Sequence, residues 1–247
     1  MSPTGTPRDD RLRCTFEPYA DERAWARGAA HAVADILRAA IERQDRAAML
    51  VSGGSTPAPV FEILAGTDLP WARVSIGLVD ERVTAEAAGR NDALLRASLL
   101  TNAATAAAFH PLLDDSSGLD AIAAAQSASA WLDGLGIAPS VVILGMGDDG
   151  HTASLFPGSS DLPAVRASTQ AYAALDATGC PGAGRYLRRI TLTPSGLARA
   201  QSQVLLLRGH GKLAVFERAL IETDPERMPI RMALDLPDSP LAVHWCP

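Results

Sequence analysis

The chain has 247 residues, of which 47% are hydrophobic and 20% charged, and its formal net charge is −6. This length suits one large domain or two small ones, and the composition is ordinary for a globular protein with a sizeable core. The acidic balance argues against a general nucleic-acid-binding surface, so an anionic substrate would need a local cluster of basic side chains. No apolar run approaches the length of a membrane span.

The cysteines and histidines suggest a reducing environment and a metal-free protein. Cys14, Cys180 and Cys246 are far apart and form no C-x-x-C pair. With no signal-peptide pattern, this predicts a cytoplasmic protein. The five histidines lack metal-ligand spacing, so we expect no metal site.

Short apolar runs alternate with longer segments of helical periodicity along most of the chain. Residues 1–11 are rich in Pro, Thr and Asp, which predicts a flexible tail. Predicted strands lie at 13–16, 47–51, 74–79, 106–109, 141–144, 171–175, 189–192, 203–207 and 241–245, and predicted helices at 21–44, 59–64, 91–100, 119–135 and 212–221, with a short helix from 194. Asp21 and Asn91 are the expected N-caps of their helices. Residues 13–16 are expected at an edge of the sheet, and 171–175 and 189–192 to form a hairpin around the loop 179–184. This alternation predicts one α/β domain over residues 12–247, with a mainly parallel sheet and helices on both faces.

The most informative stretch spans residues 141–158 and reads V-V-I-L-G-M-G-D-D-G-H-T-A-S-L-F-P-G. A buried strand leads into a glycine-rich turn with Asp148, Asp149 and His151, at the strand end where α/β sheets bind ligands. The turn also matches the dinucleotide pattern G-x-G-x-x-G, but a Pro-Gly pair stops the required helix and two carboxylates would repel a pyrophosphate. A lone histidine is usually structural. The position of His151 on this turn, beside an acid, instead favours catalysis.

Two other strand ends also carry polar groups. Residues 52–56 read S-G-G-S-T before a helix, which predicts a phosphate cradle with an ordinary capped turn as the alternative. Asp80, Glu81 and Arg82 follow the next strand. We expect Glu81 to be solvated and the side chains of Asp80 and Arg82 to face one pocket.

Lys212 is predicted to begin a helix, where the helix dipole disfavours a cation unless an anion is bound. An exposed lysine is the alternative. In a doubly wound sheet all these strand ends share one rim, which would bring together a phosphate cradle, two cations, a carboxylate and an imidazole. The sequence has no G-x-S-x-G, H-E-x-x-H or P-loop pattern to suggest a different chemistry.

The motifs in order are S-G-G-S-T-P, V-D-E-R, G-M-G-D-D-G-H-T-A-S-L-F-P-G, R-I-T-L-T-P and G-K. Over nearly the whole chain this order resembles the 6-phosphogluconolactonase family. The resemblance implies a cytoplasmic, cofactor-free enzyme of the oxidative pentose phosphate pathway that hydrolyses 6-phosphoglucono-δ-lactone to 6-phosphogluconate. It also implies a Rossmann-like fold shared with glucosamine-6-phosphate deaminase and ribose-5-phosphate isomerase.

Glucosamine-6-phosphate deaminase is the main rival, because it shares the cradle, the D-E dipeptide and the D-G-H turn. Its pattern has D-E-Y where this chain has Arg82 in the third position. It also has a glutamate five residues after the histidine, where this chain has Phe156. Loss of that carboxylate favours the hydrolase, which needs fewer proton transfers.

The reaction suggests a role for each candidate residue. His151 would take a proton from water and return it to the leaving oxygen, with Asp149 fixing its tautomer. Arg82 would stabilise the oxyanion or hold the phosphate. The remaining candidates bind substrate. The phosphate would be held by Gly53, Gly54, Ser55, Thr56 and Lys212, Asp80 would bind sugar hydroxyls or orient Arg82, and Arg189 would be a further cation.

The expected partner is a phosphorylated sugar lactone, with no nucleic acid or membrane partner, and the expected state is a monomer or weak homodimer. A sugar-phosphate sensor without turnover is a second functional class on the same fold. The presence of His151 argues against a sensor.

Overall fold

The computed structural model describes residues 14–113 and 119–247. Seven parallel strands form its central sheet, in the order β1-β10-β9-β6-β2-β3-β5. Their bounds are Cys14–Pro18 (β1), Ala47–Val51 (β2), Val74–Leu78 (β3), Ala108–Phe109 (β5), Val141–Leu144 (β6), Gln203–Arg208 (β9) and Leu241–Cys246 (β10). The predicted parallel α/β sheet is confirmed, with the first strand at its edge as expected. The tail predicted for residues 1–11 lies outside the described residues.

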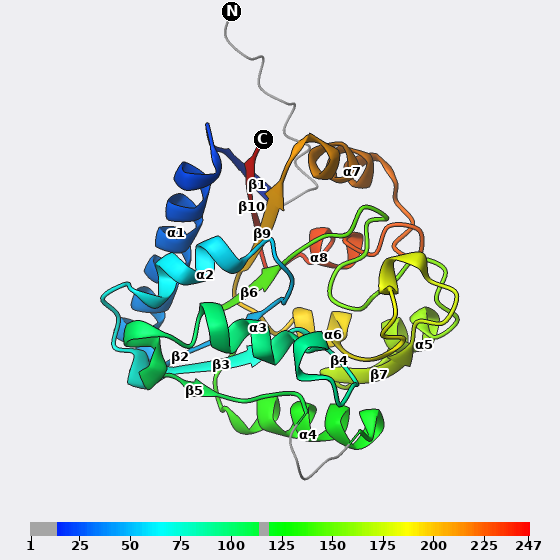
Figure 1. Ribbon diagram of the computed structural model, residues 1–247, viewed down its shortest axis with the longest axis horizontal. Helices are drawn as coiled ribbons and strands as arrows, with labels where there is room; N and C mark the ends of the chain where they lie inside the picture. The colour runs from blue at the N-terminus through cyan, green and yellow to red at the C-terminus, as the bar shows by residue number, and fades with distance from the viewer. Residues whose placement is uncertain (1–13, 114–118) are drawn as a thin grey trace, which may run out of the picture.

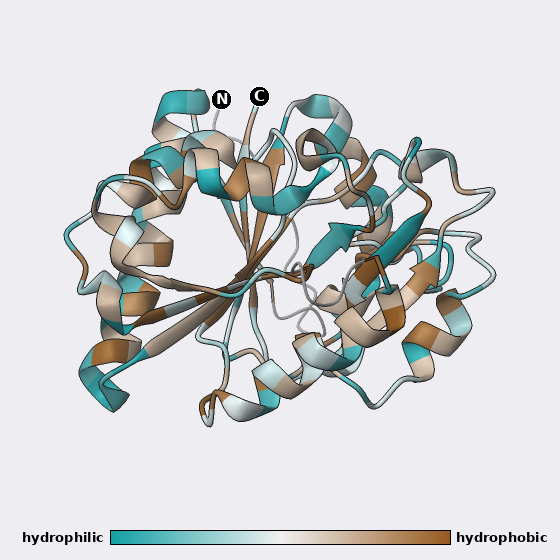
Figure 2. Ribbon diagram, turned by 60° about the horizontal axis from the view of Figure 1, so that its bottom comes forward, coloured by the Kyte–Doolittle hydropathy of each residue, from teal (hydrophilic) through white to brown (hydrophobic). Residues whose placement is uncertain are grey.

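Helices pack on both sides of this sheet (Figure 1). The α-helices are Glu22–Gln44 (α1), Ala58–Ala65 (α2), Asn91–Ser98 (α3), Ala121–Gly134 (α4), Leu162–Ala167 (α5), Pro194–Leu197 (α6), His210–Ile221 (α7) and Arg231–Leu234 (α8). Figure 2 shows hydrophobic strands crossing the middle of the molecule between helices whose outer faces are more polar. Within the described residues, no helix is both long and apolar enough to cross a membrane.

The first helix shows how the local sequence sets an element's ends and its buried face. The Asp21 side chain accepts a hydrogen bond from the backbone N–H of Ala24 at 2.8 Å, as expected of an N-cap. Apolar residues at helical spacing, among them Val33, Leu37 and Ile41, are buried against the sheet and α2. At the other end, Asp45 adopts a left-handed conformation (φ 65°), and its N–H donates to the Ile41 carbonyl.

A second, antiparallel sheet lies beside the first, in the order β4-β8-β7. Its strands are Asp80–Arg82 (β4), Tyr172–Asp176 (β7) and Arg188–Leu192 (β8), and the last two form the predicted hairpin. Val79 joins the two sheets, because its N–H donates to the Val51 carbonyl of the first and its carbonyl accepts from Leu192 of the second. This junction brings β4 and the hairpin to the carboxyl ends of the parallel strands.

Two sequence predictions in this region are wrong. Glu81 is fully buried rather than solvated, since it lies on β4. Asn91 is not an N-cap: α3 begins with Asn91, and the residue at the cap position, Arg90, makes no side-chain capping bond. Both errors have one cause, because the Glu81 carboxylate reaches across from β4 and binds the first N–H groups of α3.

Candidate active site

A cavity of about 390 Å³ opens where the parallel strands meet the second sheet. Three groups of residues line it: those after β2 and β6, those of β4 and the start of α3, and the hairpin loop 182–186 with Arg189 of β8. In chain order the lining residues are Ser52, Gly53, Gly54, Asp80, Arg82, Asn91, Gly145, Ala153, Phe156, Gly182, Ala183, Gly184, Arg185, Tyr186 and Arg189. Of the predicted rim, Ser52, Gly53 and Gly54 after β2 and Asp80 and Arg82 on β4 line the cavity, whereas Asp149 and His151 after β6 are not lining residues.

Asp149 and His151 form a close pair on the turn after β6. His151 Nδ1 lies 2.6 Å from Asp149 Oδ1, and the His151 backbone N–H also donates to that oxygen. Burial alone would raise the pKa of Asp149, but the hydrogen bond and charge of His151 lower it below its usual value. An ionised carboxylate only accepts, so Nδ1 carries the proton and Nε2 carries the lone pair in the neutral ring.

The hairpin loop brings the edge of the cavity to this pair. A Cβ atom added to Gly182 would lie 2.4 Å from Asp149 Oδ2 and 3.0 Å from His151 Nδ1. The loop can approach this closely only because residue 182 has no side chain. Phe156, which lines the cavity, has its ring centroid 4.6 Å from that of His151. The imidazole therefore adjoins two residues of the cavity wall.

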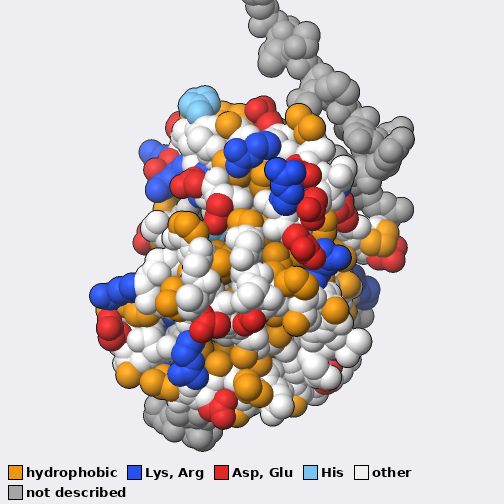
Figure 3. Space-filling model, turned by 90° about the vertical axis from the view of Figure 1, so that its right-hand side faces the viewer, with side chains coloured by type: hydrophobic (Ala, Val, Ile, Leu, Met, Phe, Trp, Pro, Cys, Tyr) orange, Lys and Arg blue, Asp and Glu red, His pale blue; other side chains and the backbone are white. Residues whose placement is uncertain are grey.

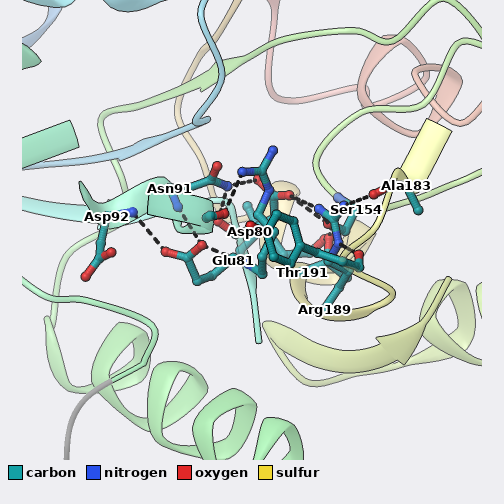
Figure 4. Close-up of polar contacts among 12 residues, drawn as sticks. Asp80, Glu81, Asn91, Asp92, Ser154, Ala183, Arg189 and Thr191 are labelled. Atoms are coloured by element: carbon teal, nitrogen blue, oxygen red, sulfur yellow. Dashed lines mark hydrogen bonds and ion pairs between the residues drawn. The ribbon is translucent and has the colours of Figure 1, made fainter. Parts of the chain in front are cut away.

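Asp80, Ser154 and Arg189 form a buried polar network under the cavity (Figure 4). The Ser154 hydroxyl donates to Asp80 Oδ2 at 2.7 Å and accepts from Arg189 Nη1 at 3.3 Å. The guanidinium of Arg189 also donates to the carbonyls of Tyr186 and Ala183, each at 2.6 Å. Arg189 thus fixes the hairpin loop against β4, and Asp80 has a fixed position in the cavity.

Arg82 lies on the cavity wall as predicted, and its Nη1 donates to the Gly89 carbonyl at 2.9 Å. Its Nε is buried without a hydrogen-bond partner. An unpaired buried N–H of a cation is costly.

The predicted phosphate cradle is only partly on the cavity wall. Gly53 and Gly54 line the cavity, whereas Ser55 is exposed and neither it nor Thr56 is a lining residue. The neighbouring Ser52 hydroxyl accepts from the Gly145 N–H at 3.3 Å, which ties the ends of β2 and β6 together.

Lys212 lies outside the cavity lining. The helix begins at His210 rather than at Lys212, so the lysine is the third helical residue, still within the first turn. Its Nζ lies 2.9 Å from Asp148 Oδ1, on the same turn as His151. The anion expected near Lys212 is thus supplied here by the protein, through a carboxylate whose side chain is 88% exposed.

On the outer wall, Arg185 and Tyr186 of the hairpin loop both contact Glu86, at 2.7 and 3.0 Å. The face of the molecule seen in Figure 3 carries acidic and basic side chains interspersed.

Among the residues that the structure describes, no cluster of three or more His, Cys, Asp or Glu side chains could hold a metal ion.

Comparison with known proteins supplies the family. A model described as glucosamine-6-phosphate isomerases/6-phosphogluconolactonase matches residues 20–243. The chain belongs to this family. A protein of Xylella fastidiosa named 6-phosphogluconolactonase is 45% identical over 242 residues, covering 98% of this chain and 99% of its own length. One of Pseudomonas putida with the same name is 44% identical, covering 92% and 91%.

A solved structure of a 6-phosphogluconolactonase from Shewanella baltica matches with a TM-score of 0.88 and 34% identity, covering 95% of this chain and 98% of that one. The predicted fold class and family resemblance are confirmed, and with them an enzyme of 6-phosphogluconolactonase type.

Several residues that build this site have no role that sequence patterns reveal. The sequence predicts Asn91 only as a helix cap and the loop 179–184 only as a hairpin connection. Ser154 lies three residues after His151 and has no sequence signal of its own. Ser154 and Thr152 flank Ala153, whose φ of 50° is unusual for a non-glycine residue. Only the structure shows that this turn places Ser154 in the site.

Proposed function

We propose that this chain hydrolyses 6-phosphoglucono-δ-lactone to 6-phosphogluconate in the oxidative pentose phosphate pathway. The observation that carries the proposal is the Asp149–His151 pair beside the cavity, with Nδ1 held at 2.6 Å by the carboxylate. The near full-length relatives named 6-phosphogluconolactonase support the choice of substrate.

In the proposed mechanism, Nε2 of His151 takes a proton from water as the water oxygen attacks the lactone carbonyl carbon. The carbonyl π electrons move to oxygen, and the resulting oxyanion needs a positive or hydrogen-bonding partner. Arg82 is suited to this, as a cation on the cavity wall, or to the phosphate. When the ring C–O bond breaks, His151 returns its proton to the departing ring oxygen. Asp149 holds the imidazole in the required tautomer throughout.

The rest of the cavity would bind the sugar and its phosphate. Asp80 is held by Ser154 and Asn91, which leaves a fixed carboxylate for sugar hydroxyls. The turn Gly53–Thr56 and Lys212 are the proposed phosphate ligands. Arg189 lines the cavity, but its guanidinium already donates hydrogen bonds to two loop carbonyls and to Ser154. Any contact with substrate would be additional to that structural role.

The deaminase activity is less favoured because of Phe156. Its side chain is 1% exposed and lies against both the His151 ring and the Arg189 guanidinium, at 4.6 and 5.4 Å. An apolar ring there supplies no carboxylate for the extra proton transfers. The deciding test follows lactone disappearance and, separately, ammonia release from glucosamine 6-phosphate. We expect lactone hydrolysis above the spontaneous rate and no ammonia, whereas the reverse result would reassign the chain to the deaminases.

Lys212→Ala should weaken binding of 6-phosphogluconate by about 1.5–3 kcal/mol, the usual contribution of a charge-assisted hydrogen bond. Binding of unphosphorylated gluconate should hardly change. Calorimetric titration of both ligands measures the difference. Asp148→Asn is the matched control, because it frees Lys212 from its present partner and should not weaken phosphate binding. Equal losses for both ligands would mean that Lys212 contacts the sugar or supports the fold. No loss for either would make it a surface lysine.

Removal of metal ions should leave the hydrolysis rate unchanged, since all the proposed catalytic groups are side chains of the protein. The measurement is the corrected rate after prolonged dialysis against a chelator. Activity that is lost on chelation and restored by a divalent cation would overturn the metal-free mechanism.

Two further expectations belong to this proposal. Cys14, Cys180 and Cys246 are all free thiols, which suits the cytoplasm. Residues 12–247 are proposed to act as one domain, because the main core cluster includes Tyr172, Ile190 and Leu192 of the second sheet.

A further inference from the structure

Glu81 is a buried carboxylate for which the mechanism above has no use. Its side chain lies at the interface of β4 and α3, and the residue has no exposed surface. Oε1 accepts from the backbone N–H groups of Arg82 and Asn91, at 2.8 and 2.6 Å, and Oε2 accepts from that of Asp92 at 2.9 Å. Two of these three bonds are therefore made to the first turn of α3 (Figure 4).

These bonds replace the missing local cap of α3. The first N–H groups of a helix have no partner within the helix, and a side chain at the cap position normally satisfies one of them. Arg90 occupies that position and makes no capping bond. Glu81 satisfies the N–H groups from another element, and its negative charge also suits the helix dipole. The place where α3 begins is thus set by a residue of β4.

The start of α3 in turn organises the cavity. The Asn91 side chain donates from Nδ2 to the backbone carbonyl of Asp80 at 2.9 Å and to its Oδ1 at 3.2 Å. On its other side it packs against the phosphate cradle, since a Cβ atom on Gly53 would lie 2.1 Å from Asn91 Oδ1. Asn91 thus connects the two parts of the cavity to which the sugar and the phosphate are assigned.

We propose that Glu81 is a positioning residue for the substrate: by capping α3 it holds Asn91, and through Asn91 it sets the distance between Asp80 and the Gly53 turn. The inference rests on the proposed function for the identity of the ligand. Glu81 touches no reacting atom, so its loss should weaken binding and leave the chemical step on His151 nearly unchanged.

The charges around Glu81 make this role dependent on pH. Burial raises the pKa of Glu81 to about 7, against the lowering effect of its three backbone hydrogen bonds, and Asp80 raises it further. The neighbouring Asp92 donates its backbone N–H to Glu81, and its carboxylate lies 3.3 Å from Arg90 Nε. The neighbouring cations are Arg82 on β4, Arg90 before α3 and Arg189 on β8. Above neutral pH the ionised carboxylate accepts all three bonds. Below it the protonated group is a weaker cap.

The test compares the dissociation constant for 6-phosphogluconate of Glu81→Gln with that of wild type, as the ratio of variant to wild type. Both constants are measured by calorimetry at about pH 6 and about pH 8.5, on either side of the pKa of Glu81. Titration of the ligand phosphate cancels in the ratio, because it is the same for both proteins. We expect a ratio of about 10 at the higher pH, where a charged acceptor is replaced by a neutral one, and a ratio near 1 at the lower pH. The kcat for the lactone should change less than about threefold at either pH.

Asp120→Asn is the matched control, because Asp120 is an ordinary cap of α4 that accepts from the N–H groups of Ile122 and Ala123. Its ratio should be near 1 at both pH values. A Glu81→Gln ratio that is near 1 at both pH values, or equally raised at both, would overturn the inference.

Asn91→Ala provides a second variant if Glu81→Gln does not fold. Its ratio to wild type should also be larger at the higher pH, because protonation of Glu81 already weakens the wild-type arrangement at the lower pH. A ratio independent of pH would mean that Asn91 acts on the ligand alone, without Glu81, and would overturn the inference.

The wild-type protein separates this inference from the proposed function. Wild-type protein that binds 6-phosphogluconate but hydrolyses no lactone would refute the proposed function while leaving this test decisive. Wild-type protein that does not bind 6-phosphogluconate would overturn both.

Discussion

His151→Ala is expected to lower kcat for the phosphorylated lactone by about 10²- to 10⁴-fold, the usual contribution of general acid–base catalysis. The imidazole is held by Asp149 at Nδ1, beside the loop residue Gly182 and the ring of Phe156. Affinity for 6-phosphogluconate should stay nearly intact, because other residues are the proposed ligands of the phosphate and the sugar hydroxyls. The two measurements are the rate, corrected for spontaneous hydrolysis, and a calorimetric titration of the product.

His31→Ala is the matched control for this variant, since His31 is exposed on α1, far along the chain from the turn after β6. Its kcat should equal that of wild type. If His151→Ala kept more than about a third of the corrected rate, His151 would not be the general base.

The largest expected effect on stability is that of Arg189→Met, which should lower the free energy of unfolding by about 3–5 kcal/mol. Arg189 is 4% exposed, and its guanidinium donates to Ser154 and to two loop carbonyls. It also lies 3.8 Å from the Asp80 carboxylate. Methionine fills the space of the side-chain stem, but it leaves a buried carboxylate without its counter-ion and two carbonyls without donors.

Equilibrium denaturation in urea measures this loss, with Arg188→Met as the control. Arg188 precedes Arg189 on β8, is exposed, and donates to the Leu119 carbonyl. Its replacement should change the free energy of unfolding by no more than about 0.5 kcal/mol. Similar values for the two variants would mean that the buried network does not stabilise the fold.

The parallel strands could be predicted because their apolar runs have sharp ends. β2 and β6 match the predicted residues 47–51 and 141–144, since each is fully buried and glycine follows within two residues. The Asp149–His151 turn could be recognised for a related reason: a polar pair directly after a buried strand has no place in the core and faces the ligand side of the sheet.

Glu81 and Asn91 could not be assigned from local patterns. A charged triplet after a strand usually marks a solvated turn, and an asparagine before an apolar segment usually marks a helix cap. Their actual roles come from the antiparallel pairing of β4 with β8, in which Glu81 lies opposite Ile190. That pairing joins segments more than a hundred residues apart, and no short window of sequence contains it.

The sequence identifies Lys212 as a cation in the first turn of a helix, where the dipole is unfavourable, but it does not identify the partner of this lysine. The choice between a bound phosphate and Asp148 depends on how the turn after β6 lies against α7. The sequence predicts Arg189 only as a further cation, because its three protein acceptors come together only once the hairpin loop is in position.

The most direct test of the central claim is the rate of δ-lactone hydrolysis by the purified wild-type protein, for glucono-δ-lactone with and without the 6-phosphate, each corrected for the spontaneous rate. We expect the corrected rate on the phosphorylated lactone to rise in proportion to protein concentration. Its kcat/KM should exceed that for the unphosphorylated lactone by at least about tenfold, as one charge-assisted phosphate contact would give. A rate on the phosphorylated lactone equal to that without protein would contradict the proposed activity, and equal kcat/KM values for the two lactones would contradict the phosphate site.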